Sequence, residues 1–137
     1  MLNERLHPGF DNQAYLCGRL LAIYDGLQWA AHVEEVGVGV ADRYFSLAST
    51  WPAVAFPRVN DLALKHLRKL RRDNRGAAVA IEKEIQSVLA RLPEPKFPGR
   101  LSLEDQGRFA IGFHHQRADS IARAMERKQK REQGEQE

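Results

Sequence analysis

The chain has 137 residues, which is enough for one domain and short for two. Its 43% hydrophobic content supplies a core, and its net charge of +3 favours nucleic acid only if the cations cluster. A single cysteine, Cys17, excludes an intramolecular disulfide framework and a cysteine-based zinc cluster, and we expect it in the core. No stretch approaches the ~20 apolar residues of a membrane span, and residues 1–11 lack signal-peptide features. We therefore expect a cytoplasmic protein with no membrane contact.

The N-terminal part of the chain predicts a long amphipathic helix. Either Asp11 or Asn12 can cap its start. Its apolar side chains recur at three- and four-residue steps and form one stripe: Leu16, Leu20, Ile23, Tyr24, Leu27 and Ala31.

A glycine-containing segment follows this helix. Residues 36–40 are the one candidate strand, but Gly37 and Gly39 favour a connection instead. A shorter helix over residues 41–48 comes next, and its expected buried side consists of Tyr44, Phe45 and Ala48.

Two helices are expected in the middle of the chain. Pro57 suits the first position of a helix over residues 57–74, with Gly76 just past its end. The second has the clearest amphipathic pattern of the sequence, in Ala78, Ile81, Ile85, Val88, Leu89 and Leu92. Three prolines then predict a loop over residues 93–99.

The last predicted helix begins at a capping box. Ser102 and Asp105 have the required spacing, and Glu104 adds negative charge to the first turn. The helix is expected to run to about Lys130 and to bury Leu103, Phe109, Ala110, Phe113, Ile121, Ala122 and Met125. Residues 129–137 are polar and predict a disordered tail. The sequence thus predicts an all-α fold, with one bundle of four to five helices over residues 1–128 and a tail over residues 129–137.

Positive charge concentrates around the helix predicted over residues 57–74. The window 58–75 holds two acidic residues, Asp61 and Asp73, and seven basic ones: Arg58, Lys65, Arg68, Lys69, Arg71, Arg72 and Arg75. It therefore carries +5 in a chain whose total is +3. A second basic set is interspersed with Glu126 and Glu132, which favours a solvated helix end: Arg123, Arg127, Lys128, Lys130 and Arg131.

Helical geometry places much of this charge on one face. At roughly 100° per residue, five cations share about a third of the circumference: Arg58, Lys65, Arg68, Lys69 and Arg72. Four apolar side chains gather on the opposite side: Val59, Ala63, Leu67 and Leu70. The result is a row of cations about 20 Å long that suits the phosphates of a nucleic-acid strand. A merely solvated face is the alternative interpretation. We predict that all seven cations, together with Arg117, bind nucleic acid.

One cluster suggests catalysis or metal binding. His115 and Asp119 are four residues apart and could share a helix face, with His114 beside them. Two ligands do not make a metal site, and no HExxH, phosphate-loop or nucleophile motif accompanies them. Gln116 and Arg117 are better interpreted as hydrogen-bonding groups, for a neighbouring loop or for a phosphate. We therefore predict no catalytic residue, no metal and no cofactor, and hence no enzyme.

Three stretches of the sequence together resemble a known family. They are NQAYLCGRLL at residues 12–21, DRYFSLAST at residues 42–50 with the later Phe56 and Pro57, and QGRFAIGFHHQR at residues 106–117. In this order and at this spacing they resemble the C-terminal region of the large subunit of the type I-C CRISPR Cascade complex. The resemblance covers residues 12–117. Because the chain is shorter than that large subunit, the expectation is its separate small subunit.

The resemblance implies a role in a ribonucleoprotein assembly for antiviral defence. Such a subunit is a helical bundle, present in two copies, that lies beside the guide RNA and helps to keep DNA strands apart in the R-loop. Its partners would be the Cascade large subunit and backbone subunits, guide RNA, target DNA and a second copy of itself. Guide pairing would read sequence, leaving this protein to contact backbone charge. Two alternatives remain: a stand-alone helical DNA-binding regulator, and a packing subunit without nucleic-acid contact.

Overall fold

The computed structural model of the protein describes residues 11–31, 39–93 and 96–136. Within these ranges the chain forms five helices and no strand: α1 (Gln13–Ala30), α2 (Val40–Thr50), α3 (Pro52–Asp73), α4 (Arg75–Arg91) and α5 (Leu103–Gln136). The predicted all-α bundle is confirmed. Residues 36–38 of the candidate strand lie outside the described residues, while Gly39 caps α2 and Val40 is its first residue.

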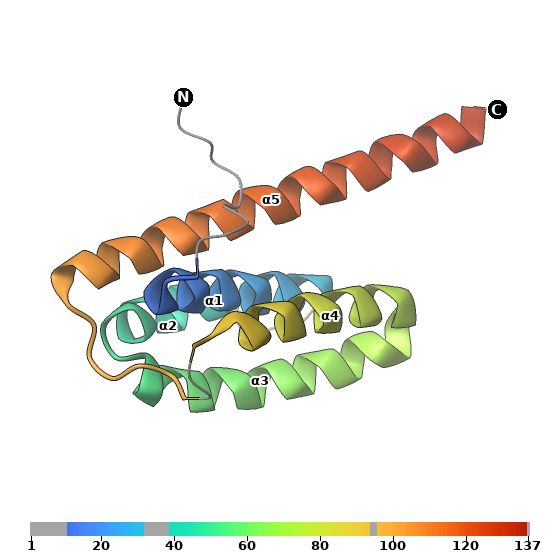
Figure 1. The fold of residues 1–137 in the computed structure, drawn as a ribbon. Helices are drawn as coiled ribbons and strands as arrows, with labels where there is room; N and C mark the ends of the chain where they lie inside the picture. The colour runs from blue at the N-terminus through green and yellow to red at the C-terminus, as the bar shows by residue number, and fades with distance from the viewer. Residues whose placement is uncertain (1–10, 32–38, 94–95, 137) are drawn as a thin grey trace, which may run out of the picture.

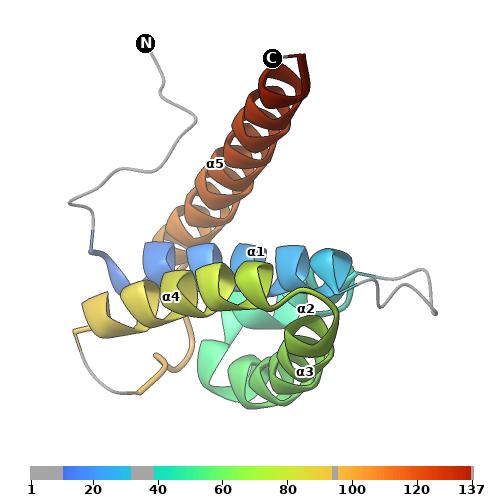
Figure 2. The same cartoon turned by 90° about the vertical axis from the view of Figure 1, so that its right-hand side faces the viewer.

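Helix α1 lies at the centre of the bundle. It contacts each of the other four helices, and α3 and α5 lie on opposite sides of the layer that α1 and α4 form (Figures 1 and 2). Most of its length is buried, because nearly every side of it faces a neighbour. Leu16, Leu20 and Leu27 are fully buried and form the middle of the core.

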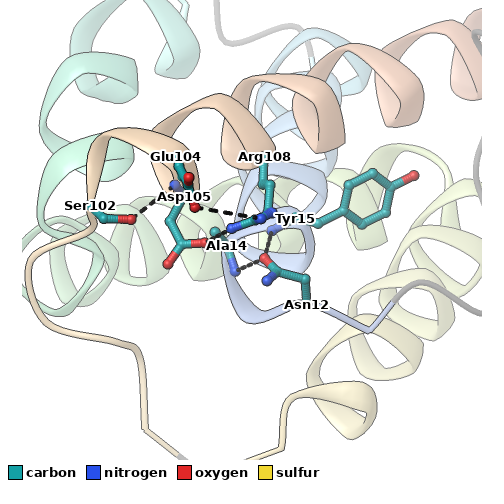
Figure 3. Close-up of polar contacts among 7 residues, drawn as sticks. All are labelled: Asn12, Ala14, Tyr15, Ser102, Glu104, Asp105 and Arg108. Carbon is teal, nitrogen blue, oxygen red and sulfur yellow. Dashed lines mark hydrogen bonds and ion pairs between the residues drawn. The ribbon is translucent and has the colours of Figure 1, made fainter.

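Local capping defines the starts of α1 and α5 (Figure 3). The Asn12 side chain accepts hydrogen bonds from the amides of Ala14 and Tyr15, at 2.9 Å and 3.2 Å. The Ser102 hydroxyl accepts a hydrogen bond from the amide of Asp105 at 3.1 Å. These side chains satisfy backbone donors that a helix start leaves without partners, as the sequence predicted.

Side chains of α1 hold the start of α2. The Asp25 carboxylate accepts a hydrogen bond from the amide of Ala41 at 2.9 Å, and the Gln28 side chain accepts one from the amide of Val40 at 2.7 Å. On α2, Ala48 is fully buried, whereas Tyr44 and Phe45 are partly buried and pack against the core. The predicted buried side of this helix is therefore correct.

Helix α3 is longer than predicted. It begins at Pro52, so Pro57 lies inside the helix and is not its first residue. An interior proline costs a helix about 3 kcal/mol, and burial of Pro52, Ala55 and Phe56 in the added turn opposes that cost. Gly76 does lie just past the end of α3, at Asp73, but it is already the second residue of α4, which starts at Arg75 after Asn74 alone. The Asn74 side chain caps α4 by accepting a hydrogen bond from the amide of Ala77 at 3.1 Å.

The predicted loop after α4 returns the chain to the junction of α2 and α3. The Phe97 ring stacks on Phe56 at a centroid distance of 4.5 Å. Backbone hydrogen bonds join Ala53 to Pro98 at 3.0 Å and Leu101 to Thr50 at 2.9 Å. These contacts fix where α5 begins.

Two glycines let α1 and α5 touch backbone to backbone. A Cβ atom added at Gly18 would lie 2.0 Å from the carbonyl oxygen of Phe109, and one at Gly112 would lie 2.1 Å from that of Tyr15. At each of these glycines, the backbone of the facing helix lies in the space that a larger side chain would need. From this contact the two helices run in the same direction and diverge, so that the C-terminal half of α5 projects beyond the bundle (Figure 1).

The buried side of α5 differs from the prediction. Phe109 and Phe113 are buried, but Leu103, Ile121 and Met125 are 84%, 52% and 59% exposed. Leu103 is the first residue of the helix, and within the described ranges no other element buries Ile121 or Met125. The helix also extends to Gln136, past the predicted end near Lys130, because Lys, Arg, Glu and Gln are good helix formers. Residues 129–136, predicted as part of a disordered tail, are therefore helical.

Cys17, the single cysteine, is expected to resist alkylation in the folded protein. Burial raises the pKa of its thiol to about 12, so almost none of the reactive thiolate is present at pH 8. Iodoacetamide labelling at pH 8 should be slow in buffer and fast in denaturant. Because the folded-state pKa lies above the unfolded value, ionisation favours the unfolded chain as pH rises above about 9. Labelling in buffer at the rate of the unfolded chain would contradict burial.

Candidate nucleic-acid interface

The cationic row predicted on α3 lies on the solvent side of that helix. The four apolar residues predicted opposite it are all buried: Val59, Ala63, Leu67 and Leu70. Arg58, Lys65, Arg68 and Arg72 are exposed on the other side. Because α3 forms the outer edge of the bundle away from α5, this face is not covered by another described element (Figures 1 and 2).

Two of the predicted cations are engaged within the protein. The Lys69 ammonium donates a hydrogen bond to the carbonyl oxygen of Ala31 at the end of α1, and it lies 3.3 Å from the Asp73 carboxylate. The Arg71 guanidinium pairs with Glu82 of α4 at 2.8 Å. These contacts tie α3 to its neighbours, so both side chains have a structural role whatever else they bind.

The remaining α3 cations have no such partner. In the ranges that the structure describes, Arg58, Lys65, Arg68 and Arg72 make no ion pair, and Arg75 at the start of α4 makes none either. Asp61 is the acidic residue on this face, one helical turn before Lys65. We name Arg58, Lys65, Arg68 and Arg72 the α3 cationic face.

Arg117 does not join this face. It lies on α5 and lines a groove between α5, α1 and α4, on the opposite side of the bundle from α3. Of the eight predicted nucleic-acid contacts, the structure thus brings four together, places Arg75 just beyond them, and separates Lys69, Arg71 and Arg117 from them by pairing or by position.

The side chains of the histidine cluster contact other residues of the protein. Nδ1 of His115 lies 3.0 Å from the hydroxyl of Tyr15, and the Asp119 carboxylate lies 2.9 Å from Nε of Arg123. His114 is exposed and its ring meets Phe113 edge to face. Among the described residues, no three His, Cys, Asp or Glu side chains are arranged to hold a metal ion.

A buried polar network joins three helices at the point where α1 and α5 diverge. Nε of Arg19 donates a hydrogen bond to the side-chain oxygen of Gln116 at 3.0 Å, and the Gln116 amide donates to Glu84 and to Ser120. Gln116 is fully buried and Arg19 is 5% exposed. Burial, followed by the nearby Arg91 charge, lowers the pKa of Arg19. Gln116 therefore binds neighbouring helices and not the loop that the sequence suggested.

Sequence reasoning missed Arg19 as part of this network. Arg19 lies between Cys17 and Leu20, on the predicted apolar side of α1. A charged residue in such a position is the sequence feature that could have indicated a buried polar network. A buried guanidinium requires hydrogen-bond acceptors, and Gln116 with Glu84 nearby supplies them.

Comparison with known proteins decides the family. The model of the family described as CRISPR-associated protein (Cas_Csd1) matches residues 2–121, which include α1 to α4 and the bundled part of α5. The chain belongs to the Cas_Csd1 family. Family membership supports a CRISPR-associated protein that is a Cascade component, as the resemblance of residues 12–117 implied. No curated protein matches the chain.

None of the helices in the described part of the chain has the length and apolar character needed to cross a lipid bilayer. The motif stretches on α1, α2 and α5 meet in space, since Tyr15, Phe45 and Phe113 surround the contact between α1 and α5.

Proposed function

We propose that this Cas_Csd1 protein acts as a non-catalytic small subunit of a type I-C CRISPR surveillance complex. In this role it binds nucleic-acid backbone without sequence specificity and thereby stabilises the R-loop and the assembly. The observation that supports the proposal most directly is the α3 cationic face, an exposed row of cations on the outer edge of the bundle that make no ion pair with the part of the chain that the structure describes.

The chemistry of this face suits phosphate and not bases. Its cations rise along a rigid helix over about 20 Å, so several phosphates of one strand can be neutralised together. Each contact releases condensed counterions, which gives salt-sensitive binding that does not depend on sequence. Sequence recognition would then belong to guide-RNA pairing, as it does in RNA-guided systems.

The proposal assigns no catalytic step to this subunit. The side chains most suited to chemistry have other roles: Cys17 is buried, His115 meets Tyr15, and Asp119 pairs with Arg123. In the proposed assembly the partners are the large subunit, the backbone subunits, guide RNA, target DNA and a second copy of this chain.

The first experiment compares the complex with and without this subunit. Affinity for target DNA would be measured for the other Cascade components alone and with the chain added, each at two salt concentrations. We expect tighter binding with the chain present, and a gain that shrinks at higher salt.

Each contrary result identifies an alternative. If the chain joins the complex but leaves DNA affinity unchanged, it is a packing subunit. If it fails to join and binds a specific DNA sequence alone, it is a helical regulator. Either result would contradict the proposed function.

A further inference from the structure

A groove separates the projecting half of α5 from α1 and α4. Its volume is about 1070 Å³, at the upper limit of the ~300–1,000 Å³ typical of small-molecule sites. Ala30 of α1, Ala77, Ala80 and Ile81 of α4, and Ile121 of α5 contribute to its surface. It lies between α5 and the layer of α1 and α4, whereas most of α3 lies on the other side of that layer (Figure 1).

The groove exposes apolar surface on helices. Of the side chains that line it, Trp29 is 46% exposed and Ile121 is 52% exposed. At Gly26 an added Cβ would meet nothing within 4 Å, so the backbone of α1 is open to close approach there. Small residues between larger apolar ones are the surface into which the side chains of another helix interdigitate.

The unsatisfied charge of the groove is positive. Its acidic residues are engaged: Asp25 accepts the amide of Ala41, and Glu84 accepts Gln116 and pairs with Arg123 at 3.8 Å. The other cations that line it make no ion pair within the described ranges: Arg117, Arg127, Lys130 and Arg131. These four cations lie along α5 on one side of the groove, beside the apolar residues of α1 and α4 that form its floor.

We propose that this groove binds an amphipathic helix of a protein partner, with the apolar side of that helix on the floor and Asp or Glu side chains along its edge against α5. Apolar burial would supply affinity, and the charges would set orientation. The partner helix would also cover the projecting half of α5. The inference does not depend on the proposed role of the α3 cationic face.

Two other occupants fit less well. A nucleic-acid strand would meet the α5 cations through its phosphates but would leave the apolar floor uncovered, because Trp29 is the one aromatic side chain lining the groove, among the described residues, on which a base could stack. A second copy would offer its own projecting α5, whose residues 117–134 carry six basic and three acidic side chains and would meet like charge.

Site-specific photo-crosslinking in the assembled complex tests the proposal. Ala80→p-benzoylphenylalanine places the probe in the groove, and the same substitution at Val79, an exposed neighbour outside it, is the matched control. We expect position 80, and not position 79, to crosslink to an acidic helical segment of another protein subunit. Crosslinking to nucleic acid, to a second copy or to nothing would overturn the proposal.

Two variants separate the apolar and charged parts of the contact. Reversal of Arg127, Lys130 and Arg131 to Glu should lower the crosslink yield at least about tenfold. Gly26→Phe should fill the groove and displace the partner helix, whereas Gly107→Phe, on α5 with equally open space, should not. Thermal unfolding would verify that each variant is folded. Unchanged yields in the folded charge-reversal and Gly26→Phe variants would contradict the proposed occupant.

Discussion

Gly18→Ala is expected to lower the free energy of unfolding by about 3 kcal/mol, the upper end of the usual cost of overpacking. The added methyl group would meet the carbonyl oxygen of Phe109 at 2.0 Å, and a backbone atom cannot rotate away as a side chain can. The helices α1 and α5 must therefore separate, which also loosens the hydrogen bond between Arg19 and Gln116. Gly112→Ala should behave in the same way, because its methyl group would meet the carbonyl oxygen of Tyr15.

Urea unfolding monitored by circular dichroism would measure both variants. Gly107→Ala is the matched control, because it lies on α5 with Gly112 and an added Cβ there meets nothing within 4 Å. That control should be neutral or stabilising by up to about 1 kcal/mol, since alanine is the better helix former. If Gly18→Ala and Gly107→Ala had the same effect, the close contact between α1 and α5 would be refuted.

Reversal of Lys65, Arg68 and Arg72 to Glu is expected to weaken target-DNA binding by the complex on the order of 100-fold near 0.1 M salt. These three side chains lie on the α3 cationic face, are exposed and make no ion pair within the described ranges. Removing about three phosphate contacts should also reduce the slope of log affinity against log salt by about 3. The effect should be uniform across target sequences that pair equally well with the guide.

Two further variants test whether DNA affinity changes in the direction that the charge of the α3 cationic face requires. Asp61→Asn removes the acidic residue from the same face and should increase DNA affinity at low salt. Arg71→Ala removes a cation that already pairs with Glu82, so we expect a smaller loss than for Arg68→Ala. A folded triple variant that kept full affinity and salt dependence would refute nucleic-acid binding by α3.

Much of the fold could be predicted from the sequence, because the helices of this chain carry local signals. Asn12 and Ser102 cap helices where predicted, and the apolar side of α3 faces the core as its spacing indicated. The errors concern boundaries. Pro57 looked like a helix start because proline at such a position is favoured locally, whereas packing of Ala55 and Phe56 extends α3 back to Pro52.

The candidate site could be predicted in part. Helical periodicity placed the α3 cations on one face correctly, since that placement needs only the repeat of the helix. Periodicity could not show that Lys69 reaches the end of α1, that Arg71 meets Glu82, or that Arg117 lies on the other side of the bundle. Those facts depend on which helices become neighbours.

The sequence by itself thus determined the helices, their apolar stripes, the charge of α3 and the family resemblance, because each is encoded in short-range patterns. The tertiary structure alone decided how α1 and α5 meet, through the Gly18 and Gly112 contacts, and which apolar residues of α5 remain exposed. The physical reason is that burial depends on a partner surface. Ile121 and Phe113 belong to the same helical pattern, yet α1 and α2 cover Phe113 while Ile121 is 52% exposed at the groove between α5, α1 and α4.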